Sequence, residues 1–218
     1  NVTGVDNTYI GYSAGLGATG NSNSNNVGVG SNALLAITTG GSNTAVGYNA
    51  GLAIADVADT VAIGTYALTS TADSNGDGAV AVGAFALRDL NPSGGNGTTG
   101  VGYKAGTELT TGVSNTILGH SALFTATTAL NNVAIGTNAM KSVKTATAVN
   151  GCVAIGANAL LGNSSNSTGI NGTVAIGTTA LYALTTGAGN TAIGQSVMND
   201  LVEGERNTAI GHSAFSGA

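Results

Sequence analysis

Charge is scarce in this sequence. Charged residues make up only 7% of the 218-residue chain, whereas a typical soluble domain contains roughly 25%. The five lysine and arginine residues are dispersed and the formal net charge is −5, so we expect no nucleic-acid-binding surface. No apolar run approaches the roughly 18 residues that a membrane span needs. We therefore expect no membrane insertion in this segment.

Residues that support catalysis or covalent cross-linking are equally few. The chain has no tryptophan and a single cysteine, Cys152, which excludes an intrachain disulfide framework. No nucleophile is paired with an acid or base in any recognisable pattern. Glu203 and Glu205 flank a glycine and could pair as glycosidase carboxylates do, but a solvated surface is the simpler interpretation. We expect no enzyme and no cofactor.

What the sequence does contain is one short phrase, repeated twelve times. The phrase is seen in residues 132–140, where Asn132 begins the run NVAIGTNAM. Each copy has a fixed glycine, and successive glycines are separated by 17 to 21 residues. They are Gly11, Gly30, Gly47, Gly64, Gly83, Gly102, Gly119, Gly136, Gly156, Gly177, Gly194 and Gly211. A period of this length that covers the whole chain is the signature of a solenoid or a similar repeat architecture.

The three residues before each glycine predict a β-strand. Counting the glycine as position 0, position −1 is always Ile, Val or Leu, and position −3 is always Thr or Val. Position −2 is Ala or Gly in ten copies, the exceptions being Tyr9 and Ile117. Such period-two alternation is typical of a strand. We expect the large −1 and −3 side chains to point into the core and the small −2 column to face the backbone of another copy of the chain.

Other positions refine this prediction. Position −4 is Asn in seven copies, which predicts a ladder of stacked amides. The glycine at position 0 suits a turn with positive φ. Position +4 is Gly only where position +1 is Tyr, at Tyr12, Tyr48 and Tyr103. This pairing predicts an exchange of volume between the tyrosine ring and the missing aliphatic side chain.

The segments between the phrases carry the variation in length. They swell at residues 20–25, 71–78, 91–97, 142–151 and 162–172, and loops absorb such insertions. No change of composition divides the chain, so residues 1–218 read as one β-solenoid domain of about twelve coils, a fragment or processed part of a longer protein. Each coil offers few apolar side chains. We therefore expect lateral packing in a homo-oligomer.

Two phrases carry a resemblance to known proteins. Asn43 to Gly51 and Asn207 to Phe215 resemble the head repeats of YadA-type trimeric autotransporter adhesins and the longer repeats, with a Thr-Thr-Gly tract, of viral attachment fibres. The run from Leu184 to Gly194, which includes Thr185-Thr186-Gly187, is more similar to the fibre form. The resemblance implies a left-handed parallel β-roll that assembles as a homotrimer on a virion or cell surface.

Candidate ion sites are weak. Asp73, Asn75 and Asp77 begin like a calcium loop, but the twelfth position is Ala84 where a bidentate Glu is needed. A solvated turn is the simpler interpretation, so no metal site is expected here. His120 and His212 both stand at position +1 about five coils apart, so one chain cannot bring them together, although three copies of one His could meet on a threefold axis.

Three functions remain open. The first is a structural host-attachment fibre segment on a virion, which presents loops to cell-surface protein receptors or glycans. The second is the head of a bacterial trimeric adhesin, and either would place the chain on a virion surface or outside the cell. The third is an ice-binding solenoid, in which Thr pairs would form a flat ladder. Candidate aromatic contacts are Tyr66, Phe85, Phe124, Tyr182 and Phe215.

Overall fold

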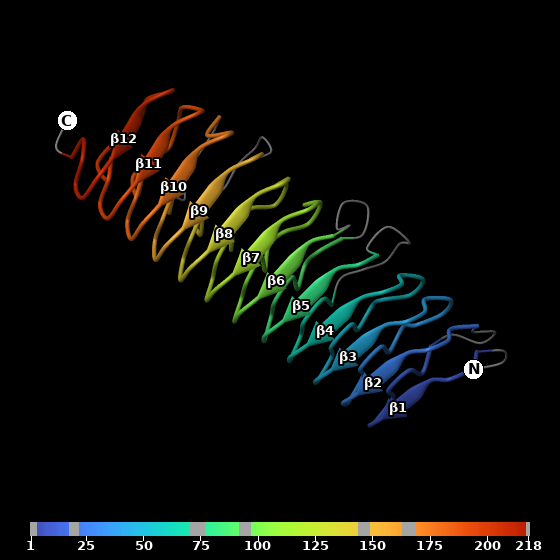
Figure 1. Ribbon diagram of the computed structural model, residues 1–218. Coiled ribbons are helices and arrows are strands. Elements are labelled where there is room, and N and C mark those ends of the chain that lie inside the picture. Colours follow the sequence, from blue (N-terminus) through green and yellow to red (C-terminus); the bar gives the residue numbers. More distant parts are fainter. Residues whose placement is uncertain are drawn as a thin grey trace.

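The chain forms a slender parallel β-solenoid, with its two termini at opposite ends (Figure 1). The computed structural model describes residues 4–17, 22–69, 77–91, 97–143, 149–162 and 169–216. Within this part of the chain, twelve strands form one sheet in sequence order. They are β1 (Thr8–Ile10), β2 (Val27–Val29), β3 (Thr44–Val46), β4 (Val61–Ile63), β5 (Val80–Val82), β6 (Thr99–Val101), β7 (Thr116–Leu118), β8 (Val133–Ile135), β9 (Val153–Ile155), β10 (Val174–Ile176), β11 (Thr191–Ile193) and β12 (Thr208–Ile210).

Every strand pairs with its neighbours in the same register. Val133, Ala134 and Ile135 of β8, for example, lie opposite Val153, Ala154 and Ile155 of β9. The predicted strands are therefore confirmed, and equivalent positions of the repeat form straight columns along the rod. The insertion of up to four extra residues between glycines does not shift this register, because the added residues lie between the strands.

The prediction of which strand face is buried is wrong. The −2 residues, most of them small, point into the coil, and all ten in β2 to β11, including Ile117, are buried. The β-branched and aliphatic residues at −3 and −1 point outward, where Leu118 is 47% and Ile63 39% exposed. Alternation correctly placed the large and small side chains on opposite faces. It did not reveal which face the rest of the coil covers.

The narrow interior of each coil explains this orientation. The opposite wall of the coil supplies a long aliphatic side chain at position +4, such as Leu87, which is fully buried. A Cβ built on Gly100, a −2 residue of the next coil, would lie 2.7 Å from Cγ of Leu87. The space is thus filled from the +4 side, and only Ala or Gly fits at most −2 positions.

The two exceptions at −2, Tyr9 and Ile117, each lie beside a +4 glycine, whereas the third +4 glycine, Gly51, faces Ile54 and Leu34 instead. A Cβ on Gly15 would meet the ring of Tyr9, and one on Gly106 would meet Cδ1 of Ile117. Volume exchange with a −2 side chain therefore occurs at two of the three +4 glycines, and the predicted exchange with the +1 tyrosine ring is wrong there. The interior ring of Tyr9 and the side chain of Ile117 fill the vacated space, whereas Tyr12 is on the outside and 79% exposed.

The predicted asparagine ladder is present and buried. The Oδ1 atom of Asn132 accepts a hydrogen bond from the backbone N–H of Cys152 at 2.9 Å. Its Nδ2 donates to Oδ1 of Asn115 at 3.1 Å and to the carbonyl of Val149 at 2.8 Å. Each such amide therefore joins neighbouring coils, and its polar atoms are satisfied inside the rod.

The position 0 glycines allow successive coils to approach closely. Their φ angles lie between 124° and 137°, in a region that L side chains rarely adopt. A Cβ on Gly136 would lie only 2.5 Å from the carbonyl oxygen of Gly156. A side chain in this column would therefore push the coils apart.

We predict that Gly136→Ala destabilises the protein by about 2 kcal/mol more than two control variants, because the added methyl group clashes with the next backbone. Gly211→Ala is the control for backbone strain, since Gly211 has a φ of 124° and nothing within 4 Å of the built Cβ. Gly151→Ala is the control for a central location with open space. Chemical unfolding at one protein concentration measures all three. Equal losses would refute the stacking constraint.

We also predict that Asn132→Ala lowers the free energy of unfolding by about 1–3 kcal/mol, because it leaves the buried N–H of Cys152 without an acceptor. Asn132→Thr should lose less, since Thr98 occupies the equivalent position and its Oγ1 accepts from the N–H of Asn115 at 3.4 Å. The same unfolding measurement compares the two variants. A threonine variant as unstable as the alanine variant would contradict the role assigned to the ladder.

Candidate functional site

The outward side chains of the strands form one continuous, uncharged and mainly aliphatic surface, which we call the strand face. It consists of the −3 and −1 residues of β1 to β12, six Thr, six Val and twelve Ile, Val or Leu in total. None is charged. With strands ~4.8 Å apart and residues ~3.3 Å apart, the face is about 53 Å long and about 10 Å wide. Parallel sheets are usually covered on both faces, so this surface is a candidate interface.

A second feature lies beside the strand face, at positions +1 and +2, directly after the glycine of each coil. Five rings from five successive coils, Tyr48, Tyr66, Phe85, Tyr103 and His120, form a continuous row that we call the aromatic stripe. Their centroids are separated by 5.4, 5.5, 6.2 and 5.3 Å in that order. Tyr66 is stacked on Phe85, and Tyr48 and Tyr103 meet this pair edge-on. The rings are half-buried or exposed.

Local backbone geometry does not favour two of these five rings. Tyr66 and Phe85 occupy position +2, with φ angles of 56° and 61°. The same position holds Asn32 at 59° and Asn138 at 58°, and Asn tolerates the left-handed region better than bulky residues do. The repeat therefore folds without aromatic residues here, and their presence needs another explanation.

The two ends of the aromatic stripe differ chemically. At one end, a hydrogen bond with Tyr48 raises the pKa of Tyr66 above its usual value, and the Asn49 side chain also contacts the Tyr66 hydroxyl. At the other end, the Lys104 ammonium lies 5.2 Å from the ring centroid of Tyr103 and 5.9 Å from that of Phe124. Two salt bridges occur among the described residues, and Lys104 takes part in neither. The stripe thus runs from neutral hydrogen-bonding groups to a positive charge.

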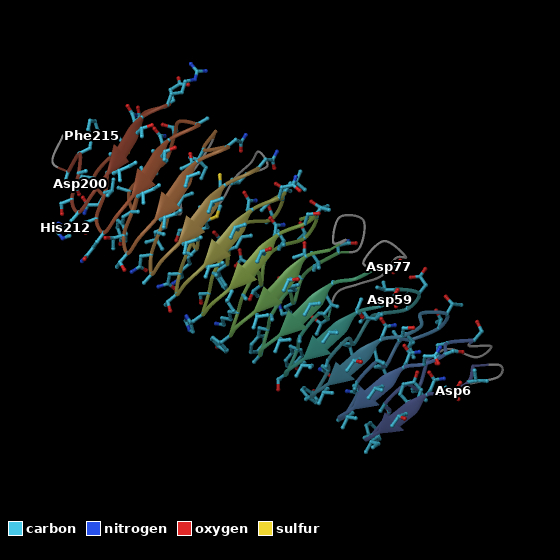
Figure 2. The ribbon with its side chains drawn as sticks, in the orientation of Figure 1. Asp6, Asp59, Asp77, Asp200, His212 and Phe215 are labelled. Carbon is cyan, nitrogen blue, oxygen red and sulfur yellow. The ribbon has the colours of Figure 1, made fainter. Side chains whose placement is uncertain are left out.

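The structure places only one of the three calcium-loop residues. Asp73 and Asn75 lie outside the described residues. The Oδ1 atom of Asp77 accepts a hydrogen bond from the backbone N–H of Ala58 at 2.8 Å, so this carboxylate joins two coils. Figure 2 shows Asp77 near Asp59 on one side of the rod. No group of three or more metal-ligating side chains occurs among the described residues.

The other predicted residues are dispersed along the rod. Tyr66 and Phe85 belong to the aromatic stripe, and Phe124 contacts its lysine. Tyr182 lies on a different part of the surface, beside a shallow pocket of about 340 Å³ that Leu161 and Val202 also line. His212 and Phe215 lie at the C-terminal end of the rod (Figure 2). His120 is far from them, at the end of the stripe.

The first threonines of three threonine pairs are used for hydrogen bonds between coils. The first hydroxyl of three pairs donates to the backbone carbonyl of the following coil at 2.9 Å. The donors are Thr38, Thr110 and Thr185. These side chains therefore serve the stacking of coils. The regular outward rows of threonine and valine are on the strand face instead.

Sequence reasoning found some of the stripe residues but missed the stripe. Tyr and His stand at position +1, whereas Tyr66 and Phe85 stand at +2, so no single column shows the pattern. Reading +1 and +2 together over five successive copies would have revealed it.

The described part of the chain also contains no helix with the length and hydropathy of a membrane span.

Cys152 is sequestered in the asparagine-ladder column. It is fully buried, and its thiol donates to the carbonyl of Ile170 at 3.1 Å. Burial raises the pKa of the Cys152 thiol to about 11. Because the thiolate is the reactive form, the native protein should not offer a reactive cysteine near neutral pH.

We predict that a chromogenic disulfide reagent leaves Cys152 of the native protein unmodified at pH 8 and modifies it fully in denaturant. The raised pKa favours the folded state below the unfolded pKa of about 8.5. This contribution should be lost as pH rises towards the folded value of about 11. Rapid, stoichiometric modification of the native protein would contradict the burial of this thiol.

Comparisons of the chain with family models, with curated proteins and with solved structures gave no match.

Proposed function

We propose that this chain is a structural segment of a host-attachment fibre on a virion, that it assembles as a homotrimer, and that its exposed loops and side chains meet protein or glycan receptors on a host cell. The observation that carries the proposal is the uncovered aliphatic strand face. Ile10, Ile63, Leu118 and Ile210 are all more than a third exposed on it, and no charge interrupts it. A continuous apolar patch of this kind marks an interaction site.

The dimensions of the strand face support association along its whole length. Its planar area is about 500 Å², which at ~25 cal/mol/Å² corresponds to about 12 kcal/mol of apolar burial. The loss of translational and rotational freedom on association costs about 4–15 kcal/mol. A few strands would therefore offset only a small part of this cost, whereas twelve in register bury an apolar area of comparable free energy.

The narrow width of the face favours packing around a common axis. A strip about 10 Å wide and five times as long can be covered from two sides if three chains meet with their strand faces inward. The number three comes from the resemblance to fibre and adhesin repeats, both of which are trimeric. Such an assembly would leave the loops and the length-variable segments on the outside, available to a receptor.

The head of a bacterial trimeric adhesin remains the alternative, because it would use the same strand face. A heptad stalk followed by a membrane barrel in the parent gene would favour the adhesin over the virion fibre. Either role places this segment on a virion or outside a cell.

One observation keeps an ice-binding solenoid as a more distant candidate. The strand face is flat and regular, and its −3 row contains six threonines in register with six valines. This role would need the face to remain open to water. A monomer with thermal hysteresis would support ice binding, whereas burial of the face between copies would exclude it.

We predict that Leu118→Lys dissociates the homotrimer into folded monomers, because the new charge would be buried among aliphatic side chains. Leu118 is already 47% exposed in the single chain, so the monomer should tolerate lysine. Thr111→Lys, at an exposed position away from the strand face, is the matched control. Multi-angle light scattering measures the mass, and circular dichroism checks the fold. A monomeric wild type, or an unchanged Leu118→Lys trimer, would contradict the proposal.

A further inference from the structure

We propose that the aromatic stripe is a binding site for a linear host-surface glycan that contains an acidic sugar. This inference rests on the proposed attachment function and assigns it a place and a ligand class. The sugar rings would lie along the row from Tyr48 to His120, and the acidic group would meet the ammonium of Lys104.

The fold does not require the stripe. Other coils carry small or polar residues at the same two positions, such as Thr137 and Asn138 after β8 or Ala157 and Asn158 after β9. There, the Nδ2 of Asn138 donates to Oδ1 of Asn158 at 3.1 Å. A hydrogen bond between two amide side chains thus joins these coils where other coils have a contact between rings. The continuous row of rings therefore belongs to five successive coils, and two of its members, Tyr66 and Phe85, stand at +2 positions whose φ angles are unfavourable for large side chains.

The spacing of the rings suits a chain of sugars. Successive centroids lie 5.3 to 6.2 Å apart in a row that zigzags, because the coils advance by only ~4.8 Å, and this advance per ring is close to the length of one pyranose unit in an extended chain. Four coil steps of ~4.8 Å make the stripe about 19 Å long. A glycan of four or five units could therefore place the apolar C–H groups of each sugar against a different ring.

The polar groups along the stripe indicate which glycans fit. The Tyr48 and Tyr66 hydroxyls and the Asn49 amide are close together at one end and can exchange hydrogen bonds with sugar hydroxyls. Lys104 projects beside Tyr103 and Phe124 at the other end. An ammonium without a carboxylate partner in the described part of the chain would attract a carboxylate or sulfate. The combination favours an acidic glycan over a neutral one.

Single-stranded nucleic acid is a poorer ligand for the same surface. Bases also stack on aromatic rings, but such proteins line the backbone path with positive charge. Here one lysine faces the stripe, and the chain carries a net charge of −5. A polymer with one phosphate per nucleotide would be repelled overall, whereas a glycan with an occasional acidic sugar would not.

The test compares glycan binding by the intact wild-type assembly and by variants that replace stripe residues with those of other coils. Tyr66→Asn and Phe85→Asn, made together, should fold normally, because Asn is found at this position in other coils. Tyr12→Ser removes an exposed tyrosine at position +1 of the first coil, outside the stripe, and is the matched control. The probes are an array of linear neutral and acidic glycans, followed by titration with sialyllactose and lactose, and with oligomannuronate and oligomannose.

We expect the wild type and Tyr12→Ser to bind at least one acidic glycan, and the double variant to lose at least tenfold in affinity. Lys104→Gln should reduce the preference for the acidic member of a pair while keeping the weaker binding of its neutral partner. Glycan binding that the double variant retains would refute the stripe as the site, although attachment through glycans would stand.

Two further outcomes would overturn the inference. If no glycan on the array binds to a correctly assembled wild type, the stripe does not serve this ligand class, and the trimer is unaffected by that result. If the double variant changes the mass of the assembly, the stripe belongs to the contact between copies. Both outcomes are distinct from the dissociation that tests the strand face.

Discussion

The close stacking of successive backbones is the constraint on which this structure depends. Each coil is hydrogen-bonded directly to the next through its strand, and the position 0 glycines bring the carbonyl of one coil to within 2.5 Å of where a Cβ would stand on its neighbour, as at Gly119 and Gly136. A coil of 17 residues wound this tightly has little internal volume. The amides of Asn115 and Asn132 use part of that volume for hydrogen bonds between coils, and aliphatic side chains from the opposite wall fill the rest.

This shortage of internal volume has a consequence for function. The large side chains at positions −3 and −1 lie on the outer face of the sheet, because in most coils the interior between them has room only for Ala or Gly at −2. The constraint that stabilises a single coil therefore creates an apolar surface that a single chain leaves uncovered. Association with further copies is the simplest way to bury it, and the proposed fibre follows from that requirement rather than from any catalytic group.

Sequence periodicity predicted much of this structure, because residues at the same position of the repeat lie one above the other in the stacked coils. The strands, the Asn132 ladder and the close approach at Gly136 all follow from columns of the repeat. The direction of the strand side chains did not, because alternation is the same whichever face is covered. The buried +4 leucines contained the missing information, since Leu87 reaches over Gly100. The residues of the strand face were thus identified, but their orientation was predicted wrongly.

The aromatic stripe escaped prediction for a related reason. Tyr48 and Tyr103 stand one residue after the glycine and Tyr66 and Phe85 two residues after it, yet their rings converge. Long side chains at positions +1 and +2 can contact each other, although they belong to different columns of the repeat. Comparing the copies one position at a time does not show such a contact. The proposed ligand site therefore depends on side-chain reach, which only coordinates display.

Small-angle X-ray scattering from the wild-type chain in solution tests the account most directly, because it reports mass and shape together. The account predicts a rod about 53 Å long with three times the mass of one chain and no dependence on moderate dilution. Scattering from a thin rod with the mass of one chain would contradict it, since the strand face would then be exposed to water.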